Sequence, residues 1–456
     1  MNNLLEVYNR QYSDNRMMIV LLFIAIFVSS LGFYFEIIEN FIPLHTSSWD
    51  DIIVTFIFFY TLKKVYGNSG YKQSAFFYLL ILISIIGIIG NVKTESPMIV
   101  ILLGLFSFMK PLLLFWSFCQ YRFRWGDFMF LMKLFAFFFP VILLSYVLDF
   151  LSPEFRQLLD LHGTEIRAGI RSLGGLFRKQ TNGVIWAEIY CIYYLYYSIK
   201  RSMWKSYVSI AIIIMSLKVK DILALIIGLP TLLMKKIKTL YLFGVLALLF
   251  VFFTLYAMLL PRHYKNYFQE DEDSNVARVV MSYTSLKIAK DYFPFGVGFG
   301  KFASPTSRDT QSDIYHKYGI DHVYGLTFDY LDDPNRQNYM CDAFWPMILG
   351  ETGVLGTLCY LCILGCAFFP FLKRYFKNTH DRRVLFPSIL FIIFFMTTIG
   401  KPVLMGPPHC LVLWGVAGIF YSLKDRQLYR ISPHIPYFIE LPTSTLKRLF
   451  GLIYSP

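Results

Sequence analysis

The chain has 456 residues, of which 56% are hydrophobic and 16% charged, and its formal net charge is +13. A soluble domain has about 45–50% apolar and about 25% charged residues. The apolar excess lies in blocks of about 15–25 residues almost free of charge, the length that crosses a bilayer. This pattern argues against a soluble multidomain protein, because no polar stretch is long enough to bury its own core.

Apolar blocks and chain breakers predict an all-α polytopic membrane protein with about twelve transmembrane helices. The first block is too long for a cleavable signal peptide and lacks a small-residue cleavage site, so we expect it to remain as the first helix. The predicted spans are residues 17–38, 49–62, 74–91, 97–119, 127–150, 183–199, 206–217, 221–234, 239–260, 344–371, 384–400 and 408–423.

These spans form one membrane domain over residues 1–456. Nine helices occupy 17–260, a large loop follows at 261–343, three more helices occupy 344–423, and 424–456 form a tail. The sequence shows no internal repeat of the kind that secondary transporters carry.

The distribution of Lys and Arg predicts the orientation. With a cytoplasmic N-terminus, the inside loops and the tail hold 23 of these residues and the short outside loops hold four. Cytoplasmic loops carry an excess of Lys and Arg, so both termini are predicted to be cytoplasmic. The same excess accounts for most of the net charge, and nucleic acid is therefore not indicated as a partner. The two long loops, 151–182 and 261–343, fall on the extracytoplasmic side.

Cofactor motifs are weak. Of the seven cysteines, Cys359 and Cys362 form a Cys-x-x-Cys, but they lie in an apolar run and are interpreted as helix-packing residues. The Gly-x-Gly-x-Gly at 296–300 has no preceding strand and fails the context test for a dinucleotide site. No metal, nucleotide or other cofactor is predicted.

Basic residues in outside loops require an explanation, because Lys and Arg are otherwise concentrated in the cytoplasmic loops. Lys218 and Lys220 lie in the turn between the short seventh and eighth spans, where they either bind an anionic ligand or extend to lipid headgroups. Arg171 lies beside Gly174-Gly175, which is typical of an anion-binding backbone or of an ordinary solvated loop.

The large loop holds further candidates. Arg278 is near the start of a predicted helix at 276–290. Glu351 is an ionisable residue inside an apolar span, which indicates a functional or structural polar contact. Asp342 lies nine residues earlier, where the loop meets the tenth span, and His322 lies in the same loop.

Taken together, these residues resemble the signature of the O-antigen ligase/polymerase family. The resemblance rests on Arg278 in a helix, on Asp291-Tyr-Phe-Pro-Phe-Gly-Val-Gly-Phe-Gly300, and on Asp342 followed by Gly350-Glu-Thr-Gly-Val-Leu-Gly356. Weaker matches upstream are Arg171-Ser-Leu-Gly-Gly-Leu-Phe177 with Asn182, and Ser216-Leu-Lys-Val-Lys220. The resemblance covers roughly residues 165–360.

The resemblance implies a membrane glycosyltransferase fold of the GT-C-like kind, in the bacterial inner membrane, with its active site on the periplasmic side. It implies transfer of a glycan from undecaprenyl pyrophosphate to another lipid-linked repeat unit, which builds O-antigen or exopolysaccharide, without a metal or a nucleotide sugar. Further implied partners are membrane lipids, a chain-length regulator and a flippase.

Two departures from the family pattern matter. Lysines stand at 218 and 220 where the family often has arginine, and Asp342 stands where ligases carry a histidine. The second departure favours a polymerase over a ligase that transfers glycan to lipid A core. A third reading, of another class, is a polysaccharide flippase or transporter, which would be expected to show paired repeats and charges near the bilayer midplane.

The resemblance, with the chemistry of a pyrophosphate leaving group, assigns expected roles. Arg278 would be the main pyrophosphate contact, assisted by Lys218, Lys220 and Arg171, because positive charge stabilises the developing anion. Asp342 would be the general base, with His322 as the alternative. Structural support is expected from Glu351, Asn182, Gly296 and Gly298.

Overall fold

We describe a computed structural model of the chain. The structural description below covers residues 2–31, 34, 49–66, 74–152, 154–159, 161, 166–167, 170–197, 203–218, 221–222, 277–328, 338–377, 382–398 and 401–423.

The described part of the chain is almost wholly helical. The longer helices are α1 (Asn2–Leu31), α3 (Trp49–Tyr66), α4 (Ser74–Lys93), α5 (Met98–Gln120), α6 (Trp125–Leu151), α8 (Gln180–Tyr196), α9 (Met203–Met215), α13 (Ala277–Asp291), α16 (Phe344–Lys377), α17 (Arg382–Thr397) and α18 (His409–Ser422). The short elements are the helices α7 (Phe155–Leu158), α14 (Pro305–Asp309) and α15 (Asp313–Lys317), and the antiparallel strands β1 (Ile166–Arg167) and β2 (Ile170–Arg171).

The helices are those of a membrane-embedded protein. Five of those described, α1, α4, α5, α6 and α16, are long and apolar enough to cross a membrane, and α9, α17 and α18 are shorter apolar helices. Ten of the twelve predicted spans coincide with described helices, whereas the spans 221–234 and 239–260 lie almost wholly outside the described residues. The total of twelve spans therefore stays a prediction.

Two predicted spans need correction. The first, 17–38, lies on a helix that ends at Leu31 and begins at Asn2. The tenth, 344–371, is not one continuous helix, because Gly353 has a non-helical backbone with φ of 64°. Hydropathy identifies an apolar stretch but cannot show where its backbone bends, since the bend at Gly353 depends on contacts with a loop that is distant in sequence.

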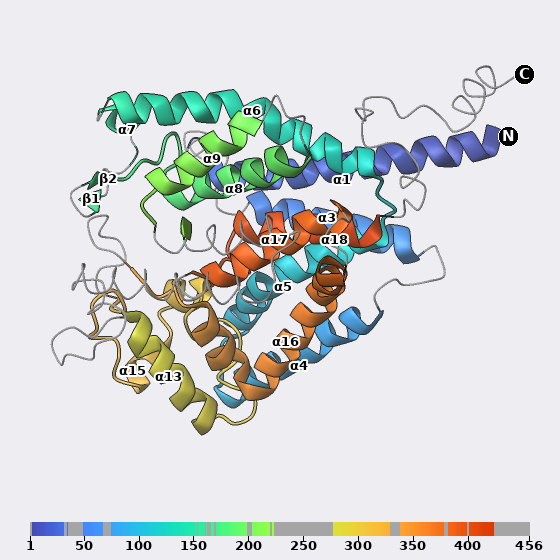
Figure 1. The fold of residues 1–456 in the computed structure, drawn as a ribbon. Coiled ribbons are helices and arrows are strands. Elements are labelled where there is room, and N and C mark those ends of the chain that lie inside the picture. The colour runs from blue at the N-terminus through green and yellow to red at the C-terminus, as the bar shows by residue number, and fades with distance from the viewer. Residues whose placement is uncertain are drawn as a thin grey trace, which may run out of the picture.

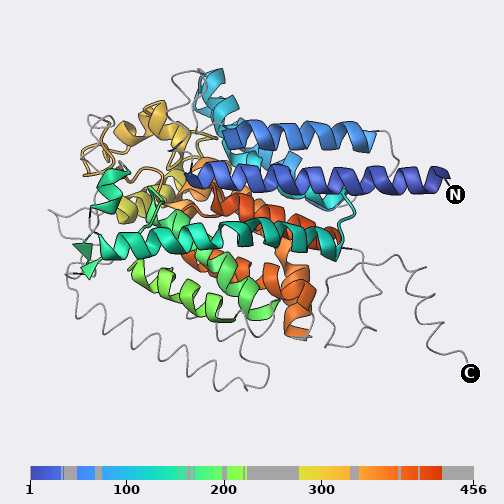
Figure 2. The ribbon, with the colours of Figure 1, turned by 90° about the horizontal axis from the view of Figure 1, so that it is seen from above.

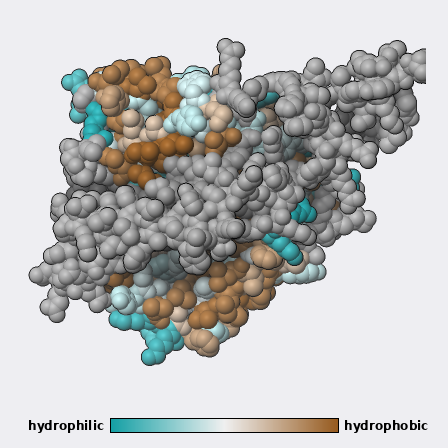
Figure 3. Space-filling view, in the orientation of Figure 1, coloured by the Kyte–Doolittle hydropathy of each residue, from teal (hydrophilic) through white to brown (hydrophobic). Residues whose placement is uncertain are grey.

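Most helices run side by side in one bundle (Figures 1 and 2). The strands β1 and β2 and the helices α13 and α15 gather at one end, which we call the loop end, and the N-terminal end of α1 projects at the other (Figure 1). Hydrophobic surface lies above and below the bundle in the same orientation (Figure 3). Large exposed apolar areas of this kind are expected of a protein that contacts lipid.

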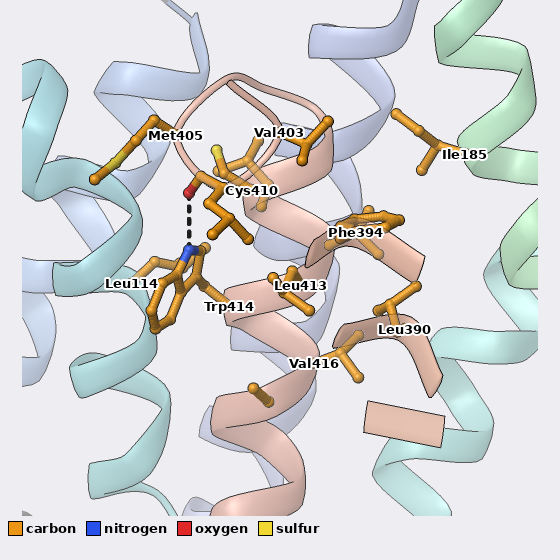
Figure 4. Close-up of a cluster of buried hydrophobic side chains, with 14 of the residues drawn as sticks. Leu114, Ile185, Leu390, Phe394, Val403, Met405, Cys410, Leu413, Trp414 and Val416 are labelled. Atoms are coloured by element: carbon orange, nitrogen blue, oxygen red, sulfur yellow. Dashed lines mark hydrogen bonds between the residues drawn. The ribbon is translucent and has the colours of Figure 1, made fainter. Parts of the chain in front are cut away.

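The centre of the bundle is α18, of whose fourteen residues twelve are buried. It packs against α1, α5 and α17. Gly415 faces Leu22 of α1 and Gly418 faces Phe118 of α5, and small residues of this kind let helices approach closely. The indole N–H of Trp414 donates to the carbonyl of Leu404 at 2.9 Å, so the polar atom of this buried side chain is paired (Figure 4).

A buried ion cluster joins α3 to α5. Lys110 lies halfway along α5 and is 6% exposed, and its ammonium is 2.7 Å from a carboxylate oxygen of Asp50 and 2.5 Å from one of Asp51. A charged side chain within a membrane helix is costly unless it is paired. The two carboxylates in the first turn of α3 therefore compensate the lysine that the helix α5 carries into the protein.

We expect Lys110→Met to destabilise the protein by about 3–5 kcal/mol, because two carboxylates are left without their buried partner. The combined variant Lys110→Met/Asp50→Asn/Asp51→Asn should recover most of the loss. Thermal unfolding in detergent measures both effects, with Lys133→Met, at an exposed position on α6, as the matched control. A loss no larger than that of the control would contradict this account.

Candidate functional site

A loop at residues 292–300 holds the loop end together, because it completes the broken helix α16. The backbone N–H of Val297 donates to the carbonyl of Gly350, and that of Gly298 donates to the carbonyl of Glu351, each at 2.9 Å. In return the N–H of Leu355 donates to the carbonyl of Pro294 at 3.2 Å. In an unbroken helix these groups would pair within α16. The loop therefore replaces the hydrogen bonds that the break at Gly353 removes.

The same loop is fastened to α4 by Asn91. The side-chain amide of this buried residue donates to the carbonyl of Phe299 at 2.9 Å, and its oxygen accepts from the N–H of Phe299 at 2.8 Å. Thr94, one turn later, donates to the carbonyl of Val297 at 2.9 Å. Two membrane helices that pack against each other, α4 and α16, thus both bind the loop.

Gly296 and Gly298 are required by this close packing. Both have positive φ, of 74° and 91°. A Cβ on Gly296 would lie 2.5 Å from the carbonyl oxygen of Gly350, and one on Gly298 would lie 2.3 Å from the backbone nitrogen of Asn91. These contacts are with backbone atoms, which cannot move aside as a flexible side chain can. The Gly-x-Gly pattern is thus explained by packing.

Glu351 supports the next part of the loop. It is 2% exposed, and its carboxyl accepts a hydrogen bond from the N–H of Phe302 at 3.3 Å. The side chain of Ser304 and the backbone N–H groups of Gly300 and Lys301 also lie close to its carboxyl. An ionisable side chain inside an apolar helix is thereby satisfied by a loop. This geometry fits the structural role expected of Glu351.

We expect Gly298→Ala to prevent correct folding or to lower the thermal stability severely, because its Cβ would overlap the backbone of α4. Gly319→Ala is the matched control: this residue also has positive φ, 62°, but a Cβ there would meet nothing within 4 Å. The control should lose only the stability that backbone strain costs, about 1–3 kcal/mol. Size-exclusion profiles and melting temperatures compare the two, and equal losses would exclude the packing explanation.

Arg278 and Asp342 form an ion pair at the loop end. An Nη of Arg278, in the first turn of α13, lies 2.6 Å from a carboxylate oxygen of Asp342, which precedes α16. The guanidinium also lies over the ring of Tyr339, 5.4 Å from its centroid. The two side chains are 24% and 29% exposed, so a ligand can reach the pair. The structure therefore brings together the two residues that the sequence placed at the centre of the site.

Other charged residues lie near Cys341, the neighbour of Asp342 in the chain, and near the start of α8. Lys401, in the loop before α18, donates to the hydroxyl of Thr181 at 2.5 Å at the N-terminal end of α8. Lys179 and Arg308 both lie close enough to Cys341 to act on it electrostatically. Lys179 immediately precedes α8, so the start of this helix, where the helix dipole is positive, lies near Cys341. The carboxylates of Asp309 and Asp342 act on the same thiol, so charges of both signs are present here.

Cys341 is next to Asp342 but is not suited to nucleophilic chemistry. The residue is half-buried, and burial raises the pKa of its thiol to about 12; the neighbouring cations Arg308 and Lys179 offset only part of that rise. The thiol therefore stays protonated at neutral pH, whereas a cysteine nucleophile acts as the thiolate.

Arg171 is paired with an internal anion. The fully buried carboxylate of Asp149, near the end of α6, lies 2.7 Å from an Nη of Arg171 and accepts the N–H groups of Gly174 and Gly175, each at 2.8 Å. The glycine N–H groups that suggested an anion site are therefore occupied by a residue of the protein. We accordingly leave Arg171 out of the proposed contacts with substrate.

Arg156 completes this network. It is 2% exposed, lies 4.0 Å from Asp149, and donates to the carbonyls of Gly175, Phe177 and Arg178. One buried carboxylate and one buried guanidinium thus fix the loop that leads into α8.

We expect Asp149→Asn to loosen this loop, because two arginines would lose their buried counter-charge. A loss of about 3 kcal/mol would increase the open fraction by roughly a hundredfold. Trypsin should then cleave after Arg171, Arg178 or Lys179 faster than in the parent protein. Asp309→Asn, at a 60% exposed side chain paired with its neighbour Arg308, is the control and should not change the cleavage rate.

The other predicted residues have separate places. Asn182 donates to the carbonyl of Ser30 at 3.2 Å, which ties α8 to the end of α1 and fits a structural role. Lys218 is half-buried in the turn after α9, next to the Arg171 loop, since Leu173 donates to the carbonyl of Met215. Lys220 lies outside the described residues. His322 is exposed, and its charge acts on Asp321.

Sequence reasoning missed Asp149, Asn91 and Lys401. Asp149 carried a usable signal, because it is a carboxylate within an apolar span, the same argument that identified Glu351. Lys401 carried a weaker signal, because it is one of the four lysines in the short outside loops. Asn91 carried none, since an amide at the end of an apolar block is ordinary. Within the described ranges, no group of three or more His, Cys, Asp or Glu residues could hold a metal ion.

Comparison with known proteins adds no family assignment. No protein-family model matches the chain, and no curated protein sequence matches it either.

Proposed function

We propose that the chain is a polysaccharide polymerase. It would transfer a glycan from undecaprenyl pyrophosphate to the non-reducing end of another lipid-linked repeat unit, on the extracytoplasmic side of the bacterial inner membrane. The observation that carries the proposal is the solvent-accessible Arg278–Asp342 pair at the loop end of a membrane-embedded bundle. It unites an anion-binding group and a candidate base.

The chemistry of the pair fits this reaction. A guanidinium presents five N–H donors in a planar fork, a geometry that suits the oxygens of a pyrophosphate. Because the fork is preformed, it stabilises negative charge as that charge develops in the transition state. Lys179, which acts electrostatically on Cys341 next to Asp342, would add to the attraction for the donor.

The proposed step is a single displacement at the anomeric carbon. Asp342 accepts the proton of the acceptor hydroxyl, and the hydroxyl oxygen forms the new glycosidic bond. The bond between the anomeric carbon and the pyrophosphate oxygen breaks, and undecaprenyl pyrophosphate leaves with the electron pair, beside Arg278. The atoms, electrons and proton of this step balance without a metal, a nucleotide or a redox partner.

We expect Arg278→Ala and Asp342→Asn each to reduce polymer formation by at least about a hundredfold, the range for removal of a base or an oxyanion donor. The assay uses the purified protein in nanodiscs with lipid-linked repeat units extracted from cells that lack this protein, and it detects a ladder of products. Asp321→Asn, at the carboxylate bound to His316 in the same loop, is the matched control. Near-normal ladders from Arg278→Ala would contradict the proposal.

A charge swap separates catalysis from stability. The double variant Arg278→Asp/Asp342→Arg can reform the ion pair, so it should regain the melting temperature lost by the single variants while remaining inactive. Recovery of activity would mean that the pair serves only structure. If Asp342→Asn stays active and His322→Ala does not, His322 is the base. Adding lipid A core as acceptor tests the ligase alternative, which would give glycan on the core and no ladder.

A further inference from the structure

The helix α13 has an exposed face that combines apolar and basic side chains. Tyr283, Leu286 and Phe293, at and just beyond the helix, are 54%, 60% and 65% exposed. Lys287 and Lys290 are exposed beside them. The opposite face, with Met281, Thr284 and Ile288, is buried, and α13 packs against α16. Large apolar side chains exposed together are unusual on a surface that meets only water.

This face continues into the surface that faces lipid. The carbonyl of Pro294, next to Phe293, accepts the N–H of Leu355 of α16. Leu355 is 40% exposed and is followed along α16 by Leu358 and Leu361, which are 55% and 44% exposed. In Figure 3 a hydrophobic area covers the lower side, where Figure 1 shows α16 and α4, and hydrophilic residues border it at the end where α13 lies.

The charges beside the apolar residues complement lipid phosphates. Lys287 and Lys290 are joined by Lys93, at the end of α4, whose ammonium lies 4.8 Å from the ring centroid of Phe295. Aromatic and basic side chains are typical of the level at which lipid headgroups lie. A helix with an apolar stripe and lysines beside it is typical of a segment that lies in the membrane surface.

We propose that α13 is a membrane-surface helix: its Tyr283/Leu286/Phe293 face enters the headgroup region of the adjacent leaflet, and Lys287, Lys290 and Lys93 bind the phosphates of anionic phospholipids. The occupant of this face is the lipid bilayer itself. The proposal does not depend on the glycosyltransferase reaction. It does mean that one helix leads from the bilayer surface to Arg278 at its other end.

Photo-crosslinking in cells tests this contact with the native cysteines retained. We place p-benzoylphenylalanine, an aromatic photo-crosslinker, at Phe293 and, in a second variant, at Leu286. Leu102, 55% exposed on the transmembrane helix α5, is the lipid-facing control, and His316, whose side chain is 88% exposed on α15, is the water-facing control. After irradiation, intact-mass spectrometry of the purified protein identifies adducts by their mass.

We expect phospholipid adducts at 293, 286 and 102 and none at 316. Protein adducts at 293 and 286 would overturn the proposal in favour of a protein partner, and the absence of any adduct there, with adducts at 102, would mean that the face meets water. The variant Lys287→Glu/Lys290→Glu should shift the adducts at 293 from anionic to zwitterionic phospholipid. An unchanged lipid distribution would overturn the role of the two lysines.

Discussion

The loop end depends on the exchange of backbone hydrogen bonds between the loop 292–300 and the break in α16. A helix that breaks inside a membrane protein exposes N–H and C=O groups, each of which costs free energy if it is left unpaired. Pro294, Val297 and Gly298 satisfy these groups. The break in turn gives the loop partners that a regular helix would not offer. Neither element would be stable in this form without the other.

Buried charge is the second constraint. Lys110 is compensated by Asp50 and Asp51, and Asp149 by Arg171 and by the N–H groups of Gly174 and Gly175. Removing one partner from a buried pair costs more than the pair contributes, so these clusters fix how neighbouring helices and loops lie. Each of these clusters contains a carboxylate that is almost fully buried, Asp50 at 4% or Asp149 at 0%, whereas both members of the Arg278–Asp342 pair are about a quarter exposed. That difference in exposure separates a site that can meet a ligand from ion pairs that serve the fold.

The candidate site was predictable only in part. Arg278 and Asp342 are 64 residues apart, and a charged residue on each side of a long loop suggested a shared site without showing a contact. Arg171, in strand β2, was predicted as part of the same anion site, but its counter-charge is Asp149, which comes 22 residues earlier in α6. The sequence cannot show which of several anions an arginine meets, because that depends on how helices pack at the loop end.

By itself the sequence determined that the chain is helical and membrane-embedded, and it located nine of the ten described helices to within several residues, whereas α1 begins 15 residues before the predicted span. It could do so because the hydropathy of a span is a local property of consecutive side chains. Only the tertiary structure decided that α16 breaks at Gly353 and that the Gly-x-Gly loop packs against Asn91. It also decided that Asp149 accepts hydrogen bonds from the backbone N–H groups of Gly174 and Gly175. These features rest on hydrogen bonds and steric contacts between residues distant in the chain, and a local pattern holds no information about them.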